Sequence, residues 1–187
     1  KIKPKYLIHC AALSRPMNVH NINISKSINT NIIGTCNVVK ACNKFKIKLI
    51  YFSTNYVYPK YKGDYKETDA VFPFNNYGWS KLGGEAAVQL YNNSLILRIC
   101  MTEKPFVHKK AFYNVKSNFI FQEEVARILF KLLNLKGILN VGGPAQSVYS
   151  FAKKQNKNVK KLKCNLKNIP LNSVMNISKL RRKLKKW

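Results

Sequence analysis

The feature that most constrains the fold of this chain is a regular alternation between short apolar runs and longer segments with helical periodicity. Four runs are typical of β-strands: residues 5–12 (KYLIHCAA), 48–53, 94–99 and 137–141. Between them, apolar side chains recur at helical spacing over residues 25–45, 77–91 and 122–134. This alternation predicts an α/β fold, a partial Rossmann-like, doubly wound parallel sheet with a small C-terminal substrate-side region.

The remaining segments are predicted to connect these elements. Residues 59–76 carry Pro, Gly, Asp and Asn and are typical of a loop. We expect residues 100–121 to be irregular and residues 148–154 to form a short helix before a lysine-rich segment. We predict one truncated domain over residues 1–187, with a core at 5–100 and a substrate-side and C-terminal region at 100–187.

The charge of the chain is strongly positive, with 34 Lys and Arg residues against 7 Asp and Glu, or a net charge of +27. Nucleic acid is not expected as the main partner, because only five basic residues are Arg and the lysines are spread along the chain. An A/T-rich genome would explain part of this composition. The lysine run at 179–186 leaves two interpretations open, a nucleic-acid-binding tail or a solvated helix.

Composition and cysteine usage limit the class of protein further. Hydrophobic residues make up 46% of the chain, which excludes general disorder, and no run reaches the ~20 apolar residues of a membrane span. No secretory signal is recognised. The cysteines are odd in number and lack a CxxC pair, so we expect neither a disulfide framework nor a metal site. Free thiols in the cytoplasm are the prediction.

Ligands of parallel α/β sheets bind at the carboxyl ends of the strands, so reactive side chains are expected there. Tyr77 and Lys81 are four residues apart on a predicted helix and therefore project from one face. A cation near a phenol lowers its pKa, so Lys81 is predicted to make Tyr77 a better proton donor and acceptor. The alternative is an ordinary helix surface.

A second polar group, Ser53–Thr54–Asn55, follows the buried strand at 48–53. A hydroxyl at this position can hydrogen-bond the same carbonyl oxygen that Tyr77 would protonate. The alternative is a residue that caps a turn as the chain leaves the strand, which is the commoner use of Ser and Thr.

Taken together, these motifs resemble the extended short-chain dehydrogenase/reductase superfamily. Within it, the chain is similar to the dTDP-4-dehydrorhamnose reductase-like and sugar-nucleotide epimerase branch. The similarity is collinear over most of residues 5–150. It rests on residues 9–12 (HCAA), 31–37 (NIIGTCN), 52–58 (FSTNYVY), 67–69 (ETD), 73–85 (PFNNYGWSKLGGE), 97–98 (LR) and 140–144 (NVGGP).

The resemblance implies an NAD(P)-dependent reductase or epimerase that acts on a nucleotide-linked sugar. Tyr77 would be the catalytic acid/base, assisted by Thr54 and Lys81, and Lys81 would also bind the nicotinamide ribose. Thr54 and Asn55 would contact the sugar. The cofactor would be bound by Ala11, Ala12, Asn31, Tyr77 and Lys81, although Asn31 has the equal alternative of satisfying local backbone groups.

The chain departs from the family pattern because it has no glycine-rich GxxGxxG turn, whose amides would hold the cofactor pyrophosphate. The family's first three strands are missing from it. We therefore expect residues 6–9 to form a bare sheet edge and NAD(P) to bind weakly or not at all. The alternative function is a non-catalytic sugar-nucleotide-binding remnant or regulatory subunit. The expected protein partner is a second copy of the chain or a separate N-terminal half, and no membrane partner is expected.

Overall fold

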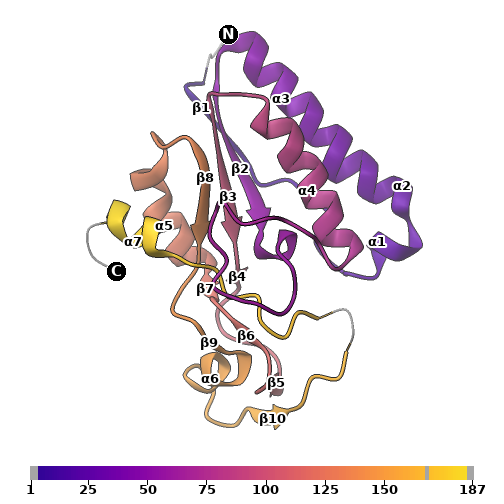
Figure 1. Cartoon of the computed structure of the whole chain (residues 1–187), viewed down its shortest axis with the longest axis vertical. Coiled ribbons are helices and arrows are strands. Elements are labelled where there is room, and N and C mark those ends of the chain that lie inside the picture. Colours follow the sequence, from indigo (N-terminus) through magenta and orange to yellow (C-terminus); the bar gives the residue numbers. More distant parts are fainter. Residues whose placement is uncertain (1–3, 167–168, 185–187) are drawn as a thin grey trace.

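The computed structural model describes residues 4–166 and 169–184 and is organised around a four-stranded sheet. Its strands are β1 (Tyr6–His9), β2 (Lys48–Thr54), β3 (Ser94–Ile99) and β8 (Gly137–Val141). They run parallel in the order β1-β2-β3-β8. The predicted parallel α/β architecture is confirmed (Figure 1).

One face of the sheet is covered by the helices that connect the first three strands. These are α1 (Val19–Ile22), α2 (Ile24–Ser27), the π-helix η1 (Ile28–Ile33), α3 (Gly34–Phe45) and α4 (Asn76–Gln89). Figure 1 shows them on the same side of the strands. Leu49 and Tyr51 of β2 and Ile96 of β3 pack there against Cys42 and Val88.

The opposite face is covered by α5 (Gln122–Leu132) and α7 (Ser178–Leu184). Ile50 of β2 and Leu95 and Leu97 of β3 point to this side, because successive strand residues alternate between faces. Their partners include Val125 and Leu129 of α5. Both faces of β2 and β3 are therefore buried, which explains why these strands are almost continuously apolar.

Residues beyond Cys100 contain short strands where an irregular stretch is predicted. They are β4 (Met101–Thr102), β5 (Lys110–Phe112), β6 (Lys116–Ser117) and β7 (Ile120–Phe121). Later segments pair with two of them: β9 (Gln146–Ser147) with β6 and β10 (Lys160–Leu162) with β5. The prediction of irregular structure is wrong here, because these strands are too short to show a periodic pattern and pair with distant residues.

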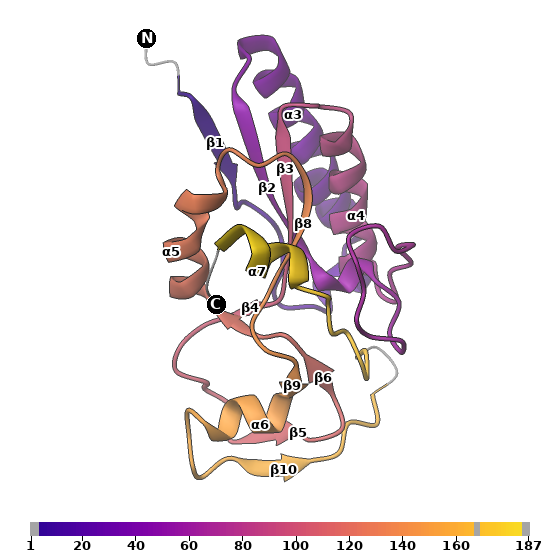
Figure 2. The same cartoon turned by 60° about the vertical axis from the view of Figure 1, so that its left-hand side comes forward.

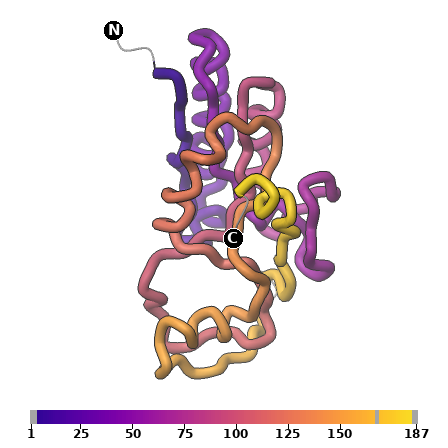
Figure 3. Tube along the Cα trace, turned by 90° about the vertical axis from the view of Figure 1, so that its left-hand side faces the viewer, coloured from indigo at the N-terminus to yellow at the C-terminus, as the bar shows by residue number. Residues whose placement is uncertain are grey.

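The helix α6 (Val148–Lys153) and these short strands form the lower end of the molecule. Figure 2 shows α6 beside β5, with β10 below them, and Figure 3 shows that this end is built from two separate stretches of chain. We call residues 104–117 and 144–166 the lower lobe. The region beyond Cys100 therefore contributes to two parts of the molecule. Its elements β8, α5 and α7 belong to the main sheet and its helical cover, whereas β5, β6, β9, β10 and α6 belong to the lower lobe.

The strand β1 lies at one end of the strand order. Within the described residues it pairs only with β2, and the side chain of Ile8 is 42% exposed. The expected bare edge is therefore present in this part of the chain. None of the helices in residues 4–166 and 169–184 has both the length and the hydrophobicity of a membrane crossing.

Candidate functional site

Tyr77 lies in the first turn of α4, at the carboxyl end of the sheet. The side chain of Asn75 starts this helix by accepting a hydrogen bond from the Gly78 N–H at 2.8 Å. The Tyr77 ring packs against His20, with 5.2 Å between ring centroids, and edge-on against Tyr56 at 6.0 Å. Aromatic neighbours on two sides fix the direction of the phenol.

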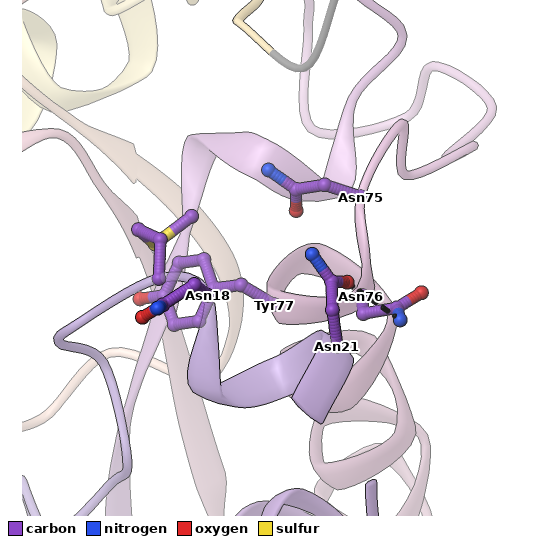
Figure 4. A pocket seen from close by; sticks show the side chains of 6 residues that line it. Asn18, Asn21, Asn75, Asn76 and Tyr77 are labelled. Atoms are coloured by element: carbon purple, nitrogen blue, oxygen red, sulfur yellow. Dashed lines mark hydrogen bonds between the residues drawn. The ribbon is translucent and has the colours of Figure 1, made fainter. Parts of the chain in front are cut away.

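A small cavity of about 100 Å³ lies next to the Tyr77 ring. Figure 4 shows the ring behind the short helix α1, with side-chain amides around the cavity. Asn76 turns toward Asn21 and donates a hydrogen bond to it at 2.9 Å. The lining side chains are neutral, polar or weakly apolar: Met17, Asn18, Asn21, Asn75, Asn76 and Tyr77.

Thr54 ends β2 and meets Tyr77 there. Burial, the largest effect, raises the pKa of Tyr77, and a hydrogen bond with the Thr54 side chain partly offsets it. The Thr54 hydroxyl also accepts a hydrogen bond from the Tyr56 N–H at 3.3 Å and so caps the 3-10 turn η2 (Asn55–Val57). The capping interpretation of Thr54 is therefore confirmed, and its role toward a substrate stays a prediction.

Lys81 lies one turn after Tyr77 on α4 and is 3% exposed. Its ammonium lies over the ring of Tyr51, with 4.3 Å between Nζ and the ring centroid. Burial lowers the pKa of Lys81 to about 8, although the Glu85 carboxylate acts against this change. Within the described residues we find no hydrogen bond donated by this ammonium.

The predicted effect of Lys81 on Tyr77 is wrong for this structure. The pKa of Tyr77 is raised, because burial of the phenol outweighs every favourable interaction with its charged form. The Lys81 ammonium instead lies over Tyr51 and lowers the pKa of His9, where burial is the larger cause. The spacing correctly predicted that the two residues lie on one helix. It did not predict that the Lys81 ammonium lies over the Tyr51 ring.

The other predicted cofactor residues come from the segment after β1 and from the π-helix η1. Ala11 and Ala12 follow β1, and neither side chain is fully buried. Asn31 sits in the π-helix η1, 1% exposed, and its amide holds the backbone of Leu13 in both directions, at 2.7 Å and 2.9 Å. It also donates to the Ser80 hydroxyl at 2.8 Å. The local-backbone interpretation of Asn31 is therefore what its contacts show.

Asn55 belongs to a buried chain of polar groups that the sequence did not reveal. Its amide donates to the Ser173 hydroxyl at 3.0 Å, and Ser173 is 3.1 Å from the Ser117 hydroxyl. Ser117 in turn lies 3.0 Å from the Cys100 sulfur. Burial raises the pKa of Cys100 to about 11, so this thiol is protonated at neutral pH. These polar groups hold Asn55 from segments that are 45 or more residues away in the sequence.

A buried ion pair between Glu85 and Arg98 joins α4 to β3, and the sequence did not reveal it. Arg98 Nε donates to Glu85 at 3.0 Å, and the Ser53 hydroxyl donates to the same carboxylate at 2.7 Å. A second Arg98 nitrogen donates to the Tyr58 hydroxyl at 2.9 Å, which donates to Asn140 at 2.8 Å. The signal in the sequence is an arginine within an otherwise apolar predicted strand, because a charged residue in a buried strand needs a partner.

The parallel sheet, the hydroxyl pair at its carboxyl end and the buried lysine one helical turn away define a Rossmann-like protein of the short-chain dehydrogenase/reductase type. A family model described as the RmlD substrate binding domain matches residues 1–114. The chain belongs to this family.

Individual relatives agree with this assignment. Methionine adenosyltransferase 2 subunit beta of Pongo abelii is 38% identical over 99 residues, or 52% of this chain. A dTDP-4-dehydrorhamnose reductase of Aggregatibacter actinomycetemcomitans is 30% identical over 152 residues, or 78% of this chain. The matches span 29% and 46% of these two relatives.

The fold also matches that of a solved enzyme. The crystal structure of dTDP-4-dehydrorhamnose reductase from Bacillus anthracis, in complex with NADP, has a TM-score of 0.85 and 25% identity to this chain. The match covers 97% of this chain and 74% of that one.

Proposed function

We propose that this chain carries the catalytic residues of an NAD(P)-dependent reductase acting on a nucleotide-linked 4-keto sugar, in the manner of dTDP-4-dehydrorhamnose reductase. The observation that carries the proposal is the position of Tyr77 beside the end of β2. Its ring packs against Tyr56, whose N–H donates to the Thr54 hydroxyl, and this hydroxyl favours the charged form of the phenol. A reductase of this class needs a proton donor and a second hydroxyl on one carbonyl oxygen. The similarity to the Aggregatibacter enzyme supports the substrate class.

In this proposal Tyr77 gives its proton to the carbonyl oxygen of the sugar, while Thr54 holds that oxygen by a hydrogen bond. The raised pKa keeps Tyr77 protonated at neutral pH, as a donor must be. Asn55, fixed by Ser173, would bind a sugar hydroxyl. The amide-lined cavity beside Tyr77 offers further neutral donors and acceptors, which suit an uncharged sugar ring.

The residues near Lys81 fit a nicotinamide cofactor, because the buried Lys81 ammonium lacks an acceptor among the described residues while Ala11 and Ala12 leave the adjacent backbone accessible. Lys81 would bind the ribose hydroxyls, and Asn31 would act by holding Leu13 in place. When bound, NAD(P) would supply or accept a hydride. The pyrophosphate of NAD(P) would need contacts other than those of Lys81 and Asn31.

The test is turnover with NADPH and a dTDP-linked 4-keto-6-deoxy sugar, for the wild-type protein and for Tyr77→Phe. We expect Tyr77→Phe to reduce turnover at least ~100-fold, because the ring and its packing remain while the proton donor is lost. Binding of the sugar nucleotide, measured by calorimetry, should stay unchanged. Measurable turnover that is equal in the two proteins would exclude Tyr77 as the acid.

A second candidate is a non-catalytic subunit with the same fold. The observation that favours it is the 38% identity to a protein named as a subunit of methionine adenosyltransferase. Calorimetry and turnover together separate the two candidates. Sugar-nucleotide binding without NADPH consumption by the wild-type protein would support the subunit, whereas turnover that depends on Tyr77 would support the reductase.

A further inference from the structure

The lower lobe concentrates positive charge that is dispersed in the sequence. Its two segments, residues 104–117 and 144–166, contain ten lysines and neither Asp nor Glu. The ion pairs found within the described residues join Arg15 to Glu103, Lys62 to Asp69 and Arg98 to Glu85, and none involves a lobe lysine. The lobe therefore presents a field of one sign, which attracts polyanions.

The ribbon formed by β5 and β10 orders part of this charge on one face. The two strands are parallel, and Lys110 is the register partner of Lys160, as Phe112 is of Leu162. Neighbouring strands lie about 4.8 Å apart, so the two lysine side chains leave the backbone side by side. Like charges in such neighbouring positions repel each other and destabilise the pair.

The helix α6 shows which face of the ribbon is open. Ala111 is 3% exposed and packs with Ala152 of α6, and the Lys161 ammonium lies 5.4 Å from the ring centroid of Tyr149 on the same helix. Because strand residues alternate between faces, residues 110, 112, 160 and 162 point away from α6. Figure 2 shows this ribbon at the lower end of the molecule.

The open face thus combines two ammonium groups with an aromatic ring and an aliphatic side chain. Both lysines are exposed, Leu162 is 40% exposed and Phe112 is half-buried. Basic groups that neutralise phosphates, next to a ring on which a base can stack, are the features that bind single-stranded nucleic acid without sequence preference.

We propose that the open face of the β5–β10 ribbon is a binding surface for single-stranded nucleic acid. An anion bound between Lys110 and Lys160 removes their mutual repulsion, and a base stacks on Phe112. None of these residues belongs to the site around Tyr77. Nucleic acid was not expected as the main partner because the lysines are spread along the sequence, but the fold brings ten of them into one lobe.

The test is fluorescence anisotropy of a labelled oligothymidylate with the full chain, at salt concentrations between about 0.05 and 0.2 M. The variant Lys110→Gln/Lys160→Gln should bind about tenfold more weakly at the lower salt, and its salt slope should fall by about 1.4, since two phosphate contacts are lost. The control is Lys40→Gln/Lys44→Gln on the exposed side of α3, which removes the same charge and should weaken binding less than about twofold.

The stacking part of the surface has its own pair of variants. Phe112→Leu should weaken binding at least about fivefold with an unchanged salt slope, because a stacked base is lost but no charge. Phe130→Leu, at a ring that is 77% exposed on α5, should have no effect. Circular dichroism confirms the fold of each variant.

Three results would overturn the proposal. One is an equal loss of affinity in the two double-lysine variants, which would mean that net charge alone attracts the oligonucleotide. Another is displacement of the oligothymidylate by polyglutamate at equal charge, which would assign the surface to an acidic protein. The third is the absence of binding at about 0.1 M salt.

Discussion

At the scale of single residues, the least expected feature is a lysine held in a nearly closed environment. Lys81 is 3% exposed, and burial lowers its pKa to about 8. The unfolded chain binds its proton up to a pH of about 10.4. Between these values the unfolded state binds more protons than the folded state, so stability rises with pH.

This difference predicts a pH dependence of the unfolding free energy. From pH 8 to about pH 9.5, Lys81 should add about 1.5 kcal/mol of stability, as measured by urea denaturation. Lys81→Met is the control, because it keeps an apolar stem over Tyr51 and removes the titrating group. The measurement stops at about pH 9.5, because tyrosines begin to titrate near pH 10 and would add their own pH dependence. Parallel pH profiles for the two proteins would show that Lys81 does not titrate in this range.

At the scale of elements, the π-helix η1 connects the segment after the first strand to α4, the helix that carries Tyr77. Its Asn31 bonds both backbone groups of Leu13 and the Ser80 hydroxyl of α4. The two helices approach closely because Gly84 has no side chain, and a Cβ there would lie 2.6 Å from the Asn31 carbonyl oxygen. One asparagine thus positions the loop of Ala11 and Ala12 relative to α4.

The substitution Asn31→Ala should lower the free energy of unfolding by about 3 kcal/mol, because it leaves the partly buried N–H and C=O of Leu13 and the buried Ser80 hydroxyl without this partner. Urea denaturation measures the loss. Asn29→Ala, at an exposed position of the same π-helix, should cost less than about 0.5 kcal/mol. A loss below about 1 kcal/mol for Asn31→Ala would mean that water replaces the amide.

At the scale of the whole molecule, the Glu85–Arg98 pair joins parts that local sequence cannot bring together. It connects α4 to β3, and through Ser53, Tyr58 and Asn140 it reaches β2, β8 and the loop after β2. Glu85 is fully buried and Arg98 is 3% exposed. Removing one partner of such a pair leaves a buried charge without compensation.

We therefore expect Glu85→Leu and Arg98→Met each to destabilise the protein by about 3–5 kcal/mol, as measured by thermal or urea unfolding. The double variant should be more stable than either single variant, because no unpaired charge remains. Additive losses in the double variant would show instead that the two residues contribute separately.

Much of the site could be predicted because it depends on short distances along the chain. The spacing of Tyr77 and Lys81 placed them on one helix, and the end of a buried strand placed Thr54 at the edge where ligands bind. The surroundings of these groups could not be predicted. Tyr51 lies within β2, and the polar chain of Ser117 and Ser173 comes from segments with no periodic pattern.

By itself, the sequence determined the parallel α/β fold, the order of its main elements and the positions of the candidate site residues on them, because periodicity and spacing are local properties. The tertiary structure alone decided three things: that the Lys81 ammonium lies over Tyr51, that Glu85 is paired with Arg98, and that scattered lysines share one lobe. Burial and charge depend on which distant segments come together, and that is a property of the packed chain rather than of any stretch of it.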